Sequence, residues 1–149
     1  MEHYTEKTLS TTQSIGVMLT KARNLVIADM DAAFRPLDIT SQQMGIIFWL
    51  SRGIAATPLE MSKRLSTDAG LMTRMLDKLE AKGLLSRSRN NTDRRAVDLK
   101  LTSKGEAIAT EIPGVALPAL NGRLRNFSKA EFKELLRLLG KLIDADIRR

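Results

Sequence analysis

The chain has 149 residues, a formal net charge of +7 and a sequence pI of about 10.1. It contains no cysteine and a single histidine, His3, which excludes thiol catalysis, disulfide bonds and thiol-based redox sensing, and argues against a metal site or a histidine-dependent triad. No apolar run reaches the roughly 20 residues that span a bilayer, and the first residues lack the features of a secretory signal. We therefore expect a cytoplasmic, single-domain protein without cofactor, metal or membrane partner.

Positive charge is concentrated between Ser62 and Lys104. This stretch holds eleven Lys and Arg residues against five Asp and Glu, a balance of +6 that accounts for nearly all of the chain's excess. Such a concentration favours a partner that carries phosphate groups. The alternative is a solvated surface that binds nothing.

The N-terminal part predicts two helices. Apolar residues recur at steps of three and four from about Thr12 to Phe34, which predicts a long amphipathic helix ended by Pro36. Thr40 and Gln43 have the spacing of a capping box and open a second helix, which is apolar nearly all round and stops near Gly53.

The middle of the chain predicts two shorter helices joined by a turn. The segment Thr57–Glu60 combines a cap, a first-turn proline and a capping box, and the helix that it opens ends near Leu65. A further helix follows from about Thr67 to Lys82. Its predicted buried stripe consists of Met72, Met75, Leu76 and Leu79.

The apolar period then changes from helical to two. Residues Leu84–Arg89 and Ala96–Thr102 predict two strands, and Asn90–Asp93 supplies the turn chemistry between them. The sequence therefore predicts a β-hairpin whose tip is crowded by basic residues, namely Arg89, Arg94 and Arg95.

Two more capping boxes predict the C-terminal helices. Ser103–Glu106 opens the first, in which Pro113 and Pro118 predict a kink or a break. Ser128–Glu131 opens the second. The predicted fold is mainly α with a small β-hairpin wing. It is one domain over 1–149, with a winged helix-turn-helix at about 37–105 and dimerisation helices at about 10–35 and 106–149.

The order of helix, turn, helix and basic hairpin points to DNA. The second helix of such a motif enters the major groove, where side chains near its start reach base edges. The expected DNA-binding residues are Thr67, Asp68, Gly70, Leu71, Thr73, Arg74, Lys78, Arg87, Arg89, Asp93, Arg94 and Arg95.

Arg74 is the first candidate for direct base readout, because a guanidinium matches guanine with two hydrogen bonds. Its alternative roles are a phosphate clamp or an ion pair with Asp77 or Glu80. Thr67 and Thr73 are candidates for phosphate contacts, although Thr67 is alternatively only a helix cap.

The hairpin tip is interpreted as a wing. An arginine there enters the narrow minor groove, where negative potential is concentrated. Arg94 and Arg95 are the candidates, and Asp93 is an orienting partner for one of them. The alternative is an exposed loop with two solvated charges.

Both terminal helices carry apolar faces with little single-domain core left to cover, so we expect them to form a homodimer. The alternative is that they pack internally. The expected dimerisation residues are Ile15, Met18, Leu19, Ala22, Phe132, Leu135, Leu136, Leu139, Leu142 and Ile143.

These segments resemble one known family. Leu65–Gly83 resembles the recognition helix of MarR-type regulators, and Asn91–Arg95 followed by Val97–Gly105 looks like the wing and exit of that family. The likeness extends from about residue 37 to residue 108. It implies an intertwined dimer that binds a pseudo-palindromic operator as a repressor.

The resemblance also implies release by a small aromatic or phenolic acid. The positions matching Thr73 and Arg87 hold a carboxylate in a related regulator, and the position matching Lys78, an arginine there, touches a second ligand. Lysine lacks the planar fork of arginine, which puts that second site in doubt. A cysteine used for oxidation sensing in that relative falls at Ala81, so this mechanism is not expected here.

A separate ligand pocket could be lined by three large side chains of one helix, although their role as plain core residues is the favoured interpretation. They are Met44, Phe48 and Trp49. The sequence also bears on two other function classes. A winged-helix module for protein interaction or RNA binding has the same fold. An enzyme is not expected, since no titratable cluster and no phosphate-cradling glycine loop occur.

Overall fold

The computed structural model describes residues 3–6, 14–54, 56–89 and 97–144. Its main elements follow the predicted order of helices and strands. They are α2 (Ile15–Phe34), the short 3-10 helix η1 (Arg35–Leu37), α3 (Ser41–Ser51), α4 (Pro58–Arg64), α5 (Ala69–Ala81), β1 (Leu85–Arg89), β2 (Val97–Leu101), α6 (Ser103–Arg123) and α7 (Lys129–Asp144).

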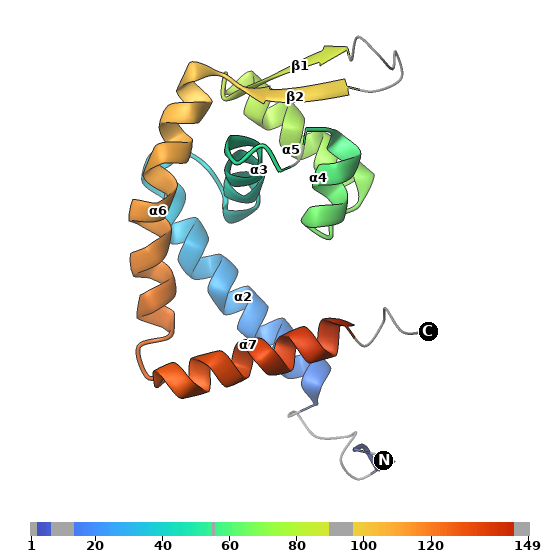
Figure 1. The fold of residues 1–149 in the computed structure, drawn as a ribbon, viewed down its shortest axis with the longest axis vertical. Coiled ribbons are helices and arrows are strands. Elements are labelled where there is room, and N and C mark those ends of the chain that lie inside the picture. Colours follow the sequence, from blue (N-terminus) through green and yellow to red (C-terminus); the bar gives the residue numbers. More distant parts are fainter. Residues whose placement is uncertain (1–2, 7–13, 55, 90–96, 145–149) are drawn as a thin grey trace.

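The helix-turn-helix and the hairpin occupy one end of the molecule, and α2 and α6 extend away from it as two long arms (Figure 1). β1 and β2 pair in an antiparallel register, with Leu85 opposite Leu101 and Arg89 opposite Val97. A hydrogen bond of 2.7 Å from the Leu99 amide to the Ala56 carbonyl joins β2 to the segment before α4. The predicted fold class, a winged helix-turn-helix with long terminal helices, is confirmed.

The core lies between α3, α5, the hairpin and the inner ends of the arms. The predicted stripe of α5 is buried, and it meets side chains from α2, α3 and α4. The largest fully buried side chains are Phe34, Ile46, Ile47, Met61, Met72, Leu76, Leu79 and Leu85. This core fixes the position of α5, whose opposite face stays exposed.

Capping side chains set most of the helix starts. The boxes predicted at Thr40, Thr57 and Ser128 are confirmed, each with a side chain three residues later bonded back to the cap. Two other caps differ from the sequence interpretation. Asp68, rather than Thr67, caps α5, and Thr102, rather than Ser103, caps α6.

Of the kink or break predicted in α6, the break is wrong. Pro113 and Pro118 both lie inside one continuous helix. The neighbouring Ile112 is buried in the core, and a contact of 2.6 Å between Arg123 and Asp29 ties the far end of α6 to α2. Packing along α2 and α3 therefore outweighs the backbone hydrogen bonds that the prolines remove.

Polar contacts join the end of α5 to the two arms. The Thr102 hydroxyl donates to the Gly83 carbonyl at 2.6 Å, and its amide donates to the Leu84 carbonyl at 3.1 Å. Lys104 donates to the Lys82 carbonyl at 3.0 Å. Lys82 in turn forms a salt bridge of 3.2 Å with Asp38, which follows α2 and η1. We call this group of contacts the α5 joint.

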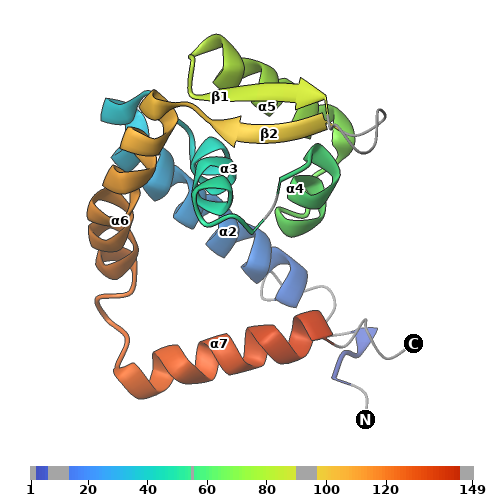
Figure 2. The same cartoon turned by 45° about the horizontal axis from the view of Figure 1, so that its top comes forward.

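Helix α7 lies apart from the winged unit, at the far end of the arms (Figure 2). Its apolar side runs toward the start of α2, and the two helices line a shared groove of about 570 Å³. In the described part of the chain, no helix combines the length and the apolar character needed to cross a bilayer.

Candidate nucleic-acid interface

The exposed face of α5 carries the predicted reading residues. Asp68 starts the helix by accepting a hydrogen bond of 2.9 Å from the Leu71 amide. Thr73, Arg74 and Lys78 follow as exposed side chains, whereas Thr67 and Leu71 are partly buried. The remaining candidate, Gly70, lies exposed in the first turn.

Arg74 is available for a ligand or partner. Its guanidinium reaches back along the helix, to within 3.9 Å of the place where a Cβ on Gly70 would lie. The alternative of an ion pair with Asp77 or Glu80 is not seen, because both acids pair with Arg87. Among the described residues, none forms a salt bridge with Arg74.

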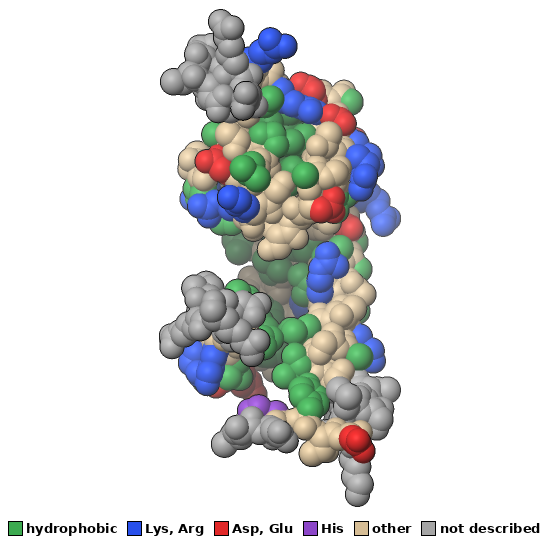
Figure 3. Space-filling view, turned by 90° about the vertical axis from the view of Figure 1, so that its right-hand side faces the viewer, with side chains coloured by type: hydrophobic (Ala, Val, Ile, Leu, Met, Phe, Trp, Pro, Cys, Tyr) green, Lys and Arg blue, Asp and Glu red, His purple; other side chains and the backbone are tan. Residues whose placement is uncertain are grey.

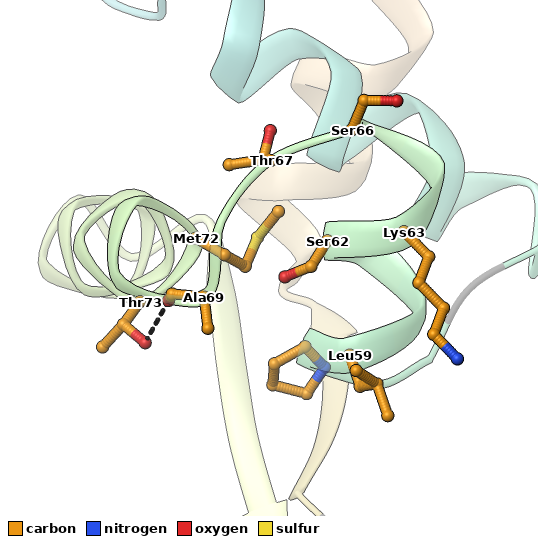
Figure 4. A pocket seen from close by; sticks show the side chains of 9 residues that line it. Leu59, Ser62, Lys63, Ser66, Thr67, Ala69, Met72 and Thr73 are labelled. Atoms are coloured by element: carbon orange, nitrogen blue, oxygen red, sulfur yellow. Dashed lines mark hydrogen bonds between the residues drawn. The ribbon is translucent and has the colours of Figure 1, made fainter.

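A cleft of about 550 Å³ separates α4 from α5 on the same side of the molecule (Figure 4). Ser62 projects from α4 toward α5, and Met72 projects from α5 into the space between them (Figure 4). Thr73 lies at the edge of the cleft, and its hydroxyl donates to the Ala69 carbonyl at 2.9 Å. Several hydroxyl groups and one lysine therefore border the cleft, and the floor of the cleft is apolar.

Sequence reasoning missed the α4 side of this cleft. Ser62, Lys63 and Ser66 line it together with Thr67 and Thr73, but they were not among the expected DNA-binding residues. In a helix-turn-helix the first helix crosses the backbone of DNA, so hydroxyl and lysine side chains on α4 were the available signal.

The hairpin residues fall into two groups. Arg89 is exposed at the end of β1. Asp93, Arg94 and Arg95 lie outside the described residues, so their predicted role in the minor groove stays a prediction. Arg87 points toward α5, where its Nη2 donates to Asp77 and its Nε lies 3.2 Å from Glu80.

Apart from Lys78, the side chains predicted to hold an effector have contacts within the chain. Arg87 meets two carboxylates, and Thr73 meets a backbone carbonyl. Met44, Phe48 and Trp49 pack as partly buried side chains against the core. Phe48 and Trp49 stack edge to face at 5.5 Å, which fits their interpretation as core residues.

Two carboxylates, Glu60 at the start of α4 and Asp29 on α2, are held in their charged form. The amides of Ala56 and Thr57 donate to Glu60 at 2.9 and 3.0 Å, and these bonds lower the pKa of Glu60. The hydrogen bond from Arg123 lowers the pKa of Asp29 in the same way. No group of three or more metal-ligating side chains occurs among the described residues.

Exposed apolar side chains are unevenly distributed along the molecule. In Figure 3, Lys and Arg residues lie around the edges of the winged end and also on the lower half. Most of the exposed large hydrophobic side chains belong to α2, α6 and α7, so the end opposite the winged unit presents apolar surface.

A capped reading helix, a preceding short helix and a hairpin packed on their core define a winged helix-turn-helix protein. The model of the MarR family matches residues 39–97. The chain is 38% identical over 109 residues to the multiple antibiotic resistance protein MarR of Escherichia coli K12. The alignment covers 72% of this chain and 76% of that protein. The chain belongs to the MarR family, whose members are transcription regulators and not enzymes.

Solved structures give the same result. The reduced form of MarR from E. coli has a TM-score of 0.74 and 31% identity, and the alignment covers 87% of this chain and 96% of that chain. A mutant of the same protein in complex with operator DNA has a TM-score of 0.78 and 32% identity, over 86% and 92% of the two chains.

Proposed function

We propose that the protein is a homodimeric repressor that binds a pseudo-palindromic operator and is released by a small aromatic or phenolic acid. The observation that carries the DNA-binding part is Arg74, which is exposed on a capped helix of the winged end and forms no salt bridge with the described residues. The complex of the E. coli relative with operator DNA supports it. Such a regulator acts on the chromosome, so we assign it to the cytoplasm.

The reading unit in this proposal spans about residues 37–105. The α5 face contributes base contacts from Arg74 and phosphate contacts from Thr73 and Lys78, and the hairpin contributes the wing. Lys and Arg side chains neutralise phosphates and release counterions, which makes binding strongly dependent on salt.

The dimer forms in this proposal through α2 and α7. Met18 on α2 is 53% exposed and Ile143 on α7 is 70% exposed, although both are large apolar side chains. The groove between these helices is lined by Ile15, Leu19, Leu135, Leu139 and Leu142. A second copy would remove this apolar surface from water and set two reading helices at a fixed separation.

Effector release acts in this proposal through that separation. A ligand that binds better to a dimer with misplaced reading helices shifts the population away from the operator-bound form. Thr73 and Arg87 remain the proposed contacts of the effector carboxylate, and Lys78 the proposed contact of a second ligand. The family resemblance is their support.

Equilibrium binding at several salt concentrations tests the function. Fluorescence anisotropy would compare a duplex from the gene's own upstream region with random duplex DNA and with duplex RNA. We expect tight, salt-sensitive binding to the upstream duplex. Absent or salt-insensitive DNA binding would overturn the proposal, and equal or tighter binding to RNA would favour an RNA-binding module.

A further inference from the structure

An acidic residue lies on the exposed face of the reading helix. Asp77 is one turn from Arg74 and next to Lys78 on α5, and its side chain is 59% exposed. A carboxylate in that place repels the phosphates of DNA. Asp77 is therefore unfavourable for DNA binding unless its carboxylate has another role.

The partner of this carboxylate is Arg87 on the neighbouring strand β1. Side chains alternate along β1, so Arg87 shares the inner face of the hairpin with the buried Leu85 and stands opposite the buried Leu99. The Arg87 side chain is only 25% exposed. Its guanidinium is thus turned toward α5 and away from the outer surface.

Two acids of α5 meet this guanidinium. Asp77 and Glu80 are three residues apart, so they lie on one side of the helix. Nη2 of Arg87 donates to Asp77, and Nε lies 3.2 Å from the Glu80 carboxylate, without the alignment of a hydrogen bond. The positive charge of Arg87 is matched within the chain before any phosphate approaches.

We propose that Asp77 and Glu80 are positioning residues, which act through Arg87 to hold the hairpin at a fixed place on the reading helix. This inference rests on the proposed DNA-binding function and deepens it. The wing reaches DNA only if the hairpin keeps its position relative to α5 while α5 lies in the major groove. We call the contacts of Arg87 with Asp77 and Glu80 the clamp. The clamp supplies that constraint at the exposed edge of the contact, where apolar packing ends.

A double-mutant cycle tests the clamp. Duplexes selected by the wild-type protein from a random pool would be titrated with Asp77→Asn, with Arg87→Met and with the double variant. We expect Asp77→Asn to weaken binding about fivefold, although it removes a negative charge, because a partly exposed ion pair has about that effect. The double variant should bind no more weakly than Arg87→Met alone.

Controls separate position from charge. Glu111→Gln removes one exposed negative charge from α6 and should leave binding unchanged or slightly tighter. Arg87→Lys keeps the charge without the fork and should restore part of the affinity. In the DNA-free protein, Asp77→Asn should speed hydrogen exchange of the β1 and β2 amides.

Three results would overturn the inference. Tighter binding by Asp77→Asn, with effects of the two single variants that add, would make Arg87 a direct DNA contact. Unchanged hydrogen exchange in the hairpin would remove the positioning role. If the wild-type protein bound no duplex, the proposed function would fail as well, whereas a wild-type protein that binds with an additive cycle would reject the clamp alone.

Discussion

The backbone of Gly105 lies against the carbonyl oxygen of Leu84, so closely that a Cβ on Gly105 would fall 2.0 Å from that oxygen. The same oxygen accepts the hydrogen bond from the Thr102 amide. The first turn of α6 is therefore packed directly onto the entry to β1. Neither backbone can move aside without loss of hydrogen bonds.

We expect Gly105→Ala to lower the free energy of unfolding by about 1–3 kcal/mol, since the added methyl group overpacks a backbone contact. Gly114→Ala is the matched control on the same helix, where, apart from the adjacent residues and the backbone of the helix itself, no described atom lies within 4 Å of the added Cβ. This substitution should leave the free energy of unfolding unchanged or raise it by up to about 1 kcal/mol, because alanine has a higher helix propensity than glycine. Denaturant titration measures both, and equal effects would contradict the contact.

Arg74→Ala should weaken binding to the selected duplex by roughly 1–3 kcal/mol and binding to random DNA by less, because a bidentate contact to guanine is lost. Anisotropy titrations on the two duplexes measure the difference. Lys78→Ala serves as comparison, with a more uniform loss and a smaller salt slope. Equal losses for Arg74→Ala on both duplexes would make Arg74 a phosphate contact.

The wing prediction concerns residues outside the described ranges. Arg95→Ala should weaken binding, and Arg94→Ala should weaken it somewhat less, because an arginine in the minor groove gains from its negative potential. Titrations on duplexes with A·T-rich and G·C-rich flanks would show the loss mainly on the former. Unchanged affinity in both variants would leave the hairpin with a structural role alone.

Leu139→Glu or Leu142→Glu should convert the protein to a monomer, since each places a charge in the apolar groove between α2 and α7. Sedimentation velocity measures the outcome. Leu59→Glu is the matched control, because Leu59 is 64% exposed but lies on α4, at the other end of the molecule. A monomeric wild-type protein, or a dimer that survives both substitutions, would reject the proposed interface.

Stability should depend on pH through Glu60. Its pKa in the folded chain is lowered from the ordinary value of 4.5. Its contribution is therefore complete above that value and is lost as the pH falls through the lower, folded pKa. Thermal melts should show a lower Tm for Glu60→Gln than for wild type at neutral pH, and the gap should close below pH 4.5. A gap that stays constant with pH would contradict this.

The sequence predicted the secondary-structure elements better than the contacts between residues. Periodicity and capping residues located every element of the winged unit, because these signals are local. Asp68 and Thr102 were passed over as caps, since in each case a neighbouring residue could also cap. The continuity of α6 through Pro113 depends on packing against α2 and α3, which no local pattern contains.

The same contrast between local patterns and tertiary contacts holds for the reading side chains. The exposed face of α5 follows from helical spacing alone, and Arg74 was found in this way. The placement of Arg87 depends on which face of β1 meets α5, although the alternation with Leu85 was a usable signal. The cleft residues of α4 needed the relative position of two helices, which only the folded chain provides.

Through the α5 joint, a small tilt of the long helix α6 displaces the end of α5. A helix of 21 residues is about 30 Å long, so a tilt of about 6° at the far end of α6 would carry its first turn, and with it the bonded end of α5, through about 3 Å. One base-pair step of DNA is about 3.4 Å. In the proposed dimer, small adjustments where the arms meet the second copy would thus become displacements of about one base pair at the reading helices.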